Sequence, residues 1–192
     1  MMPPHSKNVL VLASGGLDST ACIAYYLKNG YTPEALWVDY GHPSARQELE
    51  AISSISGHYE IRLRIVRVSG IHWNVNIASG KDEFVGRNSI LASIGLSSFV
   101  AGSGLVVMGI HADTIYSDCS IGFQNAMSHV ATIVSNGRIA LDFPFHDWTK
   151  REIVEFCKLN KVPTDLTYSC LSGAIPPCGI CSSCQDRTRF GV

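Results

Sequence analysis

One short stretch, Ser14-Gly15-Gly16-Leu17-Asp18-Ser19, constrains the fold more than any other part of this chain. It follows an apolar run, 9–13, that is typical of a buried parallel strand, and it precedes 20–29, which is predicted to be a helix. Adjacent glycines at a strand-to-helix turn leave the first backbone N–H groups of the helix accessible to an anion. The stretch therefore predicts a phosphate-binding turn. A simple glycine turn with a Ser/Asp cap is the alternative.

Two charged residues sharpen this prediction. Asp18 would repel a phosphate unless a divalent cation lies between them, so the turn predicts a nucleotide polyphosphate site that works with Mg²⁺. The segment 149–152 predicts a capping box at the start of a helix that ends near Leu159. That cap does not account for Lys150, since a cation gains nothing from the dipole at a helix N-terminus. A nearby anion such as phosphate accounts for it.

The rest of the chain alternates short apolar segments with helical patterns. Strands are predicted at 34–39, 61–68, 105–110 and 139–141, and helices at 44–56, 89–101 and 123–135. This alternation predicts an α/β fold with an open, mainly parallel, doubly wound sheet. Ligands bind beyond the carboxyl ends of the strands in such sheets, so 39–42 and 111–113 are expected beside the phosphate turn.

Several residues at this edge have a functional and a structural interpretation. His42 contacts ligand or is merely solvated. Asn88 is expected to cap a buried helix, with Arg87 as an exposed cation before it. Asp113 and Asp118 bind a metal or a substrate amine, or simply form turns. The segment 70–84 is a lid in which Trp73 stacks on a planar ligand, or surface filler.

The composition predicts an ordinary globular protein. The 192 residues suit one α/β domain, 1–165, with a small tail, 166–192, packed on it. A formal charge of −1 and 46% apolar residues argue against nucleic acid as a partner. We find neither a signal peptide nor an apolar run near the roughly 20 residues of a membrane span, and we expect a cytoplasmic protein whose cysteines are reduced.

The tail carries a cluster of cysteines that predicts a metal site. Cys170, Cys178, Cys181 and Cys184 are spaced C-x7-C-x2-C-x2-C, which matches tetrahedral Zn²⁺, and a redox disulfide is the alternative. Four protein ligands leave no open position, so the metal is expected to be structural, and its loss to affect solubility more than ATP affinity. Elsewhere, Cys22 and Cys157 are expected in the core, and Cys119 near the site.

The glycine stretch resembles the SGGxDS signature of the N-type ATP pyrophosphatases, the PP-loop family, whose fold is adenine nucleotide alpha hydrolase-like. Five motifs in order narrow the resemblance to the 7-cyano-7-deazaguanine synthases of queuosine biosynthesis. These motifs are Ser14 to Ser19, Arg87-Asn88, Asp118-Cys119, Thr149-Lys150-Arg151-Glu152-Ile153, and Ser169-Cys170 with Cys178-Gly179-Ile180-Cys181-Ser182-Ser183-Cys184. They cover nearly the full chain.

The resemblance implies a ligase that forms C–N bonds. It implies adenylation of 7-carboxy-7-deazaguanine by ATP, attack by ammonia to give an amide, and a second ATP-dependent step that gives the nitrile. No protein nucleophile is needed, and Asp18, Ser19 and Lys150 take the catalytic roles. It assigns zinc to the four tail cysteines and the deazaguanine to Arg87, Asn88, Asp113 and Asp118. It assigns ATP to Ala13, Ser14, Gly15, Gly16, Leu17, Asp18, Ser19, Thr20, Ala21, Cys22 and Ile23.

The chain also departs from this family. It has His42 where members have Gln, and Ser120-Ile121-Gly122 where they have Arg-Pro-Glu, and it is shorter between 68 and 84. A smaller, less charged pocket favours an alternative in which the activated acyl group is joined to an amine of a peptide or partner protein. An inactive nucleotide-binding module and a tRNA thiolase are further alternatives. The oligomeric state is open, with a homodimer as one option.

Overall fold

The computed structural model describes residues 6–70 and 85–192. Its five described strands form one parallel sheet in the order β3-β2-β1-β4-β5. The strands are β1 (Asn8–Leu12), β2 (Thr32–Asp39), β3 (Leu63–Arg67), β4 (Gly104–Val107) and β5 (Ile139–Asp142). The chain order reverses between β1 and β4, and ligands bind at such switch points of open sheets.

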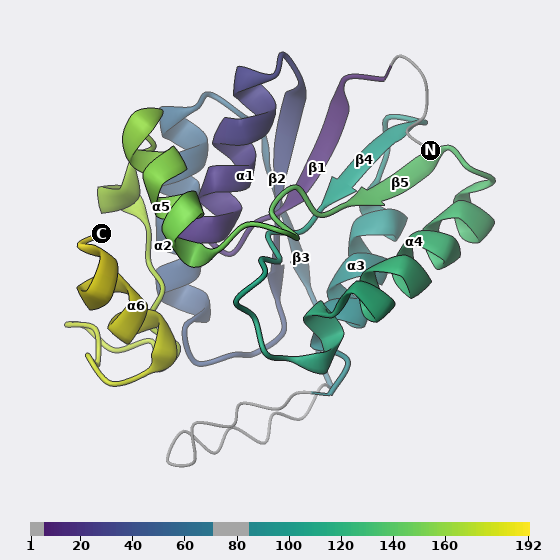
Figure 1. Ribbon diagram of the computed structural model, residues 1–192. Coiled ribbons are helices and arrows are strands. Elements are labelled where there is room, and N and C mark those ends of the chain that lie inside the picture. The colour runs from purple at the N-terminus through teal and green to yellow at the C-terminus, as the bar shows by residue number, and fades with distance from the viewer. Residues whose placement is uncertain (1–5, 71–84) are drawn as a thin grey trace.

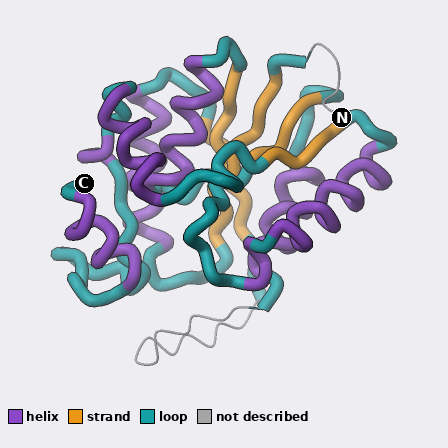
Figure 2. The backbone as a smooth tube through the Cα atoms, viewed as in Figure 1, coloured by secondary structure: helices purple, strands orange, loops and turns teal. Residues whose placement is uncertain are grey.

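Helices cover both faces of the sheet, which confirms the predicted doubly wound α/β fold (Figures 1 and 2). One side carries α1 (Leu17–Lys28), α2 (Ala45–His58) and α5 (Lys150–Leu159), with the C-terminal α6 (Ser182–Phe190) beside them. The other side carries α3 (Arg87–Ser98) and α4 (Ile121–Ser135). Two short 3-10 turns, Ser117–Cys119 and Thr164–Leu166, lie in the connections.

Strand periodicity divides the core into two layers. Val9 and Val11 of β1 pack with α1, α2 and α5, whereas Leu10 between them packs with α3 and α4. Successive strand residues point to opposite faces, so a strand that is covered on both sides is apolar at every position. Cys22 and Cys157 are fully buried in the first layer, as predicted. Both faces of the central strands are therefore fixed by packing.

The start of α3 corrects one sequence prediction. Gly86, in the left-handed conformation at φ 78°, is the N-cap, and Asn88 lies inside the helix with 5% of its surface exposed. Arg87 is the first helical residue and is only partly exposed. The carboxylate of Asp118 caps this helix from another segment, because it accepts a hydrogen bond of 3.0 Å from the Asn88 N–H. Asn88 is thus free to use its side chain elsewhere.

Other boundaries shift by a few residues. Helix α1 begins at Leu17 rather than at Thr20, and β4 ends at Val107 rather than at Ile110. Trp73 and almost all of the predicted lid lie outside the described residues. Among the helices that the structure describes, none combines the length and the apolar character needed to cross a lipid bilayer.

Candidate functional site

The glycine stretch forms the predicted strand-to-helix turn at the carboxyl end of β1. Gly16 is the N-cap of α1 with extended dihedrals, φ −79° and ψ 171°, and it has no side chain to cover the helix start. The hydroxyls of Ser19 and Thr20 donate to the Gly16 carbonyl at 3.2 and 2.8 Å. Ser14 is exposed beside them. The backbone N–H groups of a helix start, left open in this way, suit an anion.

Two glycines allow close packing around this turn. Gly15 has φ +77°, and a Cβ atom on it would lie 2.9 Å from both the Glu48 carbonyl oxygen and the Ile52 nitrogen of α2. A Cβ atom on Gly109, just beyond β4, would lie 3.2 Å from the carbonyl carbon of Asp18. The turn is therefore held between α2 and the end of β4, and the importance of Gly109 was not predicted.

Lys150 meets Asp18 in front of the turn. The Lys150 Nζ lies 2.6 and 2.8 Å from the two carboxylate oxygens, and the side chains are 13% and 28% exposed. The capping box of Thr149 and Glu152 is present as predicted and orients the first turn of α5. The expected anion near Lys150 exists, and in this structure it is the Asp18 carboxylate. The Lys150 side chain is long and partly exposed, so its ammonium group can also bind a phosphate.

The segment after β4 is fastened to the start of α5. Asp113 Oδ2 accepts from the Lys150 backbone N–H at 2.7 Å, and the Ala112 N–H donates to the Trp148 carbonyl at 2.8 Å. Asp113 therefore lies with Asp18 and Lys150 rather than with the other residues predicted to hold substrate. We call Asp18, His111, Asp113 and Lys150 the nucleotide cluster.

His111 lies at the edge where 111–113 was expected, but the sequence did not mark it as a site residue. Burial lowers the pKa of its imidazole below the ordinary value, and the nearby Asp18 carboxylate opposes that shift. Among the described residues, its buried Nδ1 has no hydrogen-bond partner. The only signal in the sequence was its position directly after a buried strand. A neutral imidazole in such a place can accept or donate one hydrogen bond to a ligand.

A second cluster joins α3 to the segment before α4. The Asn88 amide donates to the Asp118 carbonyl at 3.0 Å and to Cys119 Sγ at 3.3 Å, and the Gln124 amide donates to the Cys119 carbonyl at 2.9 Å. Burial, with a contribution from Asp118, raises the pKa of Cys119 to about 11, so the thiol stays protonated near neutral pH. We call Asn88, Asp118, Cys119 and Gln124 the acceptor cluster.

Arg87 and the residues after β2 complete this edge. Burial raises the pKa of Tyr40, and the charge of Arg87 acts in the opposite direction. The ring of Tyr40 stacks on His42 with centroids 4.1 Å apart. His42 is 7% exposed and its Nε2 lies 2.9 Å from Glu48, so the alternative of a merely solvated histidine is wrong. These rings form an aromatic wall next to Arg87.

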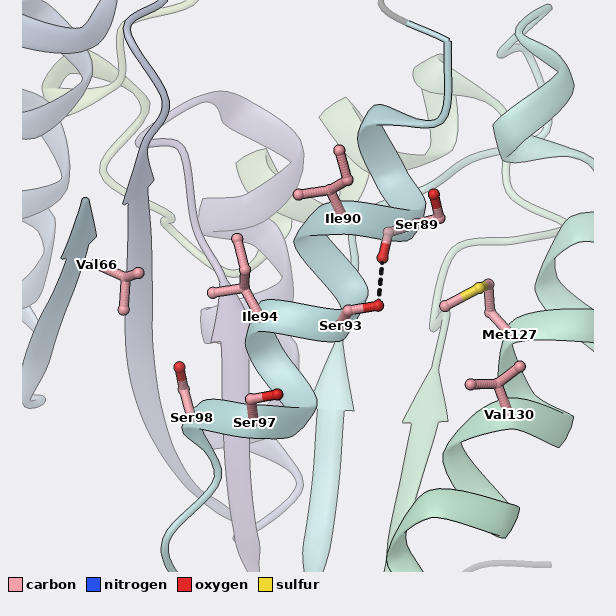
Figure 3. A pocket seen from close by; sticks show the side chains of 9 residues that line it. All are labelled: Val66, Ser89, Ile90, Ser93, Ile94, Ser97, Ser98, Met127 and Val130. Carbon is pink, nitrogen blue, oxygen red and sulfur yellow. Dashed lines mark hydrogen bonds between the residues drawn. The ribbon is translucent and has the colours of Figure 1, made fainter. Parts of the chain in front are cut away.

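An open groove lies away from this edge, between α3 and α4 (Figure 3). It is lined by Val66 of β3, by one face of α3, and by Met127 and Val130 of α4. The hydroxyl of Ser93, one of its lining residues, is exposed and donates to the Ser89 carbonyl at 2.8 Å. Within the described part of the chain, no residue of the phosphate turn contributes to the lining. The groove is therefore separate from the two clusters.

The tail brings its four cysteines together as predicted. The sulfurs of Cys170, Cys178, Cys181 and Cys184 all lie within 4.8 Å of one another, and all four are free thiols. The Cys178 N–H points at Cys170 Sγ at 3.3 Å, and the Cys181 N–H points at Cys178 Sγ at 3.4 Å. Burial raises the pKa of Cys170, but hydrogen bonds from Cys178 and Ser172 outweigh it and lower the value to about 5. Four clustered sulfurs, two of which accept backbone N–H bonds, fit a tetrahedral metal.

Comparison with known proteins agrees with this arrangement. A family model described as queuosine biosynthesis protein QueC matches residues 8–190. The chain belongs to the QueC family. A relative named 7-cyano-7-deazaguanine synthase, from Parasynechococcus marenigrum, is 34% identical over 94% of this chain and 91% of its own length. One of the same name from Desulfotalea psychrophila is 28% identical over 93% and 90%.

A solved structure gives an independent view of the fold. NMN synthetase from Francisella tularensis superimposes with a TM-score of 0.59 and 18% identity, covering 98% of this chain and 74% of that protein. At this identity the match shows a shared fold and nothing about substrate. The predicted α/β architecture is thereby confirmed.

Proposed function

We propose that this QueC-family protein is an ATP-dependent ligase that converts 7-carboxy-7-deazaguanine and ammonia into 7-amido- and then 7-cyano-7-deazaguanine. Family membership supports the reaction class. The observation that carries the assignment to this site is the Asp18–Lys150 pair in front of the open N-terminus of α1. An anion-binding helix start, a carboxylate for a cation and an ammonium group suit a triphosphate.

ATP would occupy the turn at 13–23. The backbone N–H groups at the start of α1 and the hydroxyl of Ser14 would hold phosphate oxygens. Asp18 would hold Mg²⁺, which when bound supplies positive charge to the triphosphate. Lys150 would then leave Asp18 and neutralise the pyrophosphate that departs. Ser19, whose hydroxyl donates to the Gly16 carbonyl, would act by keeping the turn in shape.

The proposed chemistry needs no protein nucleophile. A carboxylate oxygen of the substrate attacks the α-phosphorus of ATP, and the bond to pyrophosphate breaks. Ammonia attacks the acyl carbon, AMP leaves, and a proton is lost to give the amide. The amide oxygen then attacks the α-phosphorus of a second ATP and pyrophosphate leaves again. Loss of AMP and of the two amide protons gives the nitrile. A protonated Cys119, with its pKa near 11, is suited to packing and hydrogen bonding rather than to attack on carbon.

The acceptor cluster would hold the deazaguanine. Arg87 and the carboxylate of Asp118 offer a cation and an acceptor for a planar heterocycle. The half-buried ring of Tyr40, which stacks on the buried His42, offers a flat surface beside them. Asp113 would act on the nucleotide side, since it fastens the segment after β4 to α5. The four cysteines would hold a structural Zn²⁺. The cytoplasmic location and the homodimer stay predictions.

One observation favours conjugation to a protein amine as the second candidate. Ser120 stands where related proteins have a charged residue. Its hydroxyl caps α4 by accepting a hydrogen bond of 3.2 Å from the Phe123 N–H. Ile121 after it is 55% exposed, so this rim of the site is apolar and open. Such a rim can admit an amine larger than ammonia. The intact Asp18–Lys150 pair counts against an inactive module, and the near-neutral charge of the chain counts against a tRNA thiolase.

Product analysis decides between the two candidates. The protein is incubated with ATP, Mg²⁺, ammonium and 7-carboxy-7-deazaguanine, and pyrophosphate release is measured together with product mass. We expect AMP, pyrophosphate and the nitrile. A product that stops at the amide, or a protein adduct with the deazaguanine acyl mass, would favour conjugation. Formation of ADP in place of AMP would refute the adenylation chemistry.

A further inference from the structure

The segment that leads into the cysteine cluster lies directly against the phosphate turn. The Tyr168 N–H donates to the Gly15 carbonyl at 3.0 Å. A Cβ atom on Gly16 would lie 3.6 Å from the Tyr168 carbonyl oxygen and 3.8 Å from the Ser169 hydroxyl. Tyr168 and Ser169 are thus in van der Waals reach of the two glycines that shape the turn, although they follow them by about 150 residues. We call 167–173 the strap.

The strap contains a potential metal ligand and ends at a tight contact with a second loop of the site. Cys170, its fourth residue, is the first cysteine of the cluster. Gly173 has φ +69°, and a Cβ atom on it would lie 2.3 Å from the Pro43 carbonyl oxygen, next to the segment that carries His42. The strap therefore touches both the turn after β1 and the loop after β2, and only glycine fits at the second contact.

The other side of the cluster anchors the start of the strap. Arg187 of α6 donates to the Thr167 hydroxyl at 2.7 Å and to the Thr164 carbonyl at 3.3 Å. Cys184, another member of the cluster, lies one turn before it in the same helix. Four sulfurs on one ion would add to the order of the tail, because the binding free energy of such a site is also folding free energy. We therefore expect a change in the cysteine cluster to affect the strap in two ways, through helix α6 at its start and through the cysteine that the strap itself contains.

We propose that the cysteine tail is part of the nucleotide site, and that a filled metal site tightens ATP binding by holding Tyr168 against Gly15. Tyr168 acts as a positioning residue through its backbone, since it fixes the carbonyl that precedes the helix start. The inference rests on the proposed binding of ATP at this turn. Coupling between two sites is reciprocal, so bound ATP must tighten the hold on zinc by the same factor.

The wild-type protein tests this coupling without an activity assay. The equilibrium constant for binding MgATP is measured first by calorimetry. Zinc affinity is then measured by competition with a chromogenic chelator, with and without saturating MgATP, the chelator being calibrated in each solution. Couplings of this kind are typically about 5- to 150-fold, so we expect zinc affinity to rise at least about fivefold with MgATP and to stay unchanged with adenosine. Equal zinc affinities at saturating MgATP would overturn the inference.

The two proposals fail in different ways. If MgATP does not bind at all, the proposed function falls; if it binds without changing zinc affinity, only the coupling falls. A matched pair of variants in α6 gives a second test. Arg187→Ala removes the anchor of the strap and is expected to weaken ATP binding at least about fivefold, with partial rescue in Arg187→Lys. Arg189→Ala, an exposed control in the same helix, should stay near wild type. Equal ATP affinities for Arg187→Ala and Arg189→Ala would contradict the coupling.

Discussion

The nucleotide cluster and the acceptor cluster lie at the same edge of the sheet but are built in opposite ways. In the nucleotide cluster, Asp18 and Lys150 pair with each other through their side chains and remain partly exposed. In the acceptor cluster, Asn88 is buried and its amide bonds a backbone carbonyl and a thiol, while Asp118 caps α3. One region keeps charge available to a ligand, and the other uses its polar groups to fix the chain.

This difference suggests how each region works. An exchangeable ion pair can open when a triphosphate offers other partners, so the nucleotide cluster should control the rate of adenylation. A network of buried hydrogen bonds opens only at a large cost in free energy, because each broken bond would leave a desolvated polar group without a partner. The acceptor cluster should therefore control stability and the shape of the substrate pocket.

The largest effect is expected from Lys150→Met. Removing a cation that stabilises the departing pyrophosphate should lower the rate of pyrophosphate release roughly 10²- to 10³-fold, as loss of one preorganised donor does in other enzymes. The adjacent Arg151→Met is the control, since Arg151 is exposed on the same helix turn. Comparable losses of pyrophosphate-release rate in both variants would contradict the role that we give to the nucleotide cluster.

An intermediate effect is expected from Asn88→Ala. Two buried hydrogen bonds are lost, so the free energy of unfolding should fall by about 1–3 kcal/mol in urea denaturation, and the KM for the deazaguanine acid should rise with the KM for ATP unchanged. Ser93→Ala, on the exposed side of α3, should change stability by less than about 0.5 kcal/mol. A stable Asn88→Ala protein with a raised KM for ATP would show that the two clusters are not distinct.

The smallest effect concerns pH. The pKa of His111 is lowered in the folded protein, so the unfolded chain takes up a proton first as pH falls through its ordinary value of 6.5. Folding stability should then decrease below pH 6.5, with a slope of at most about 1.4 kcal/mol per pH unit from this group. His111→Asn should flatten that slope, whereas exposed His129→Gln should not. An unchanged slope of stability against pH in His111→Asn would show that the pKa of His111 is not lowered by its place in the nucleotide cluster.

Local signals in the sequence predicted much of the fold. The apolar strand before Ser14, the capping box at Thr149 and the spacing of the tail cysteines each depend on neighbouring residues, and each is present. The sequence also predicted an anion near Lys150. Its identity as Asp18 depends on how two distant helices dock, and periodicity carries no information about that.

The predictions that failed concern contacts between distant segments. Asn88 is a good N-cap by residue type, but Asp118 reaches that position from another element and displaces it. Helix α6 within the tail was not predicted at all. The contact of the tail with the phosphate turn runs through the backbone of Tyr168, where side-chain identity gives no signal.

One isotope measurement tests the central claim, that this edge of the sheet transfers adenylate to a carboxylate. The protein is given 7-carboxy-7-deazaguanine labelled with ¹⁸O in both carboxylate positions, together with ATP, Mg²⁺ and ammonium. If the carboxylate attacks the α-phosphorus, each AMP released must carry one ¹⁸O atom, first from the acid and then from the amide. Labelled AMP with unlabelled pyrophosphate is the result that we predict. Unlabelled AMP, or label in inorganic phosphate beside ADP, would contradict it.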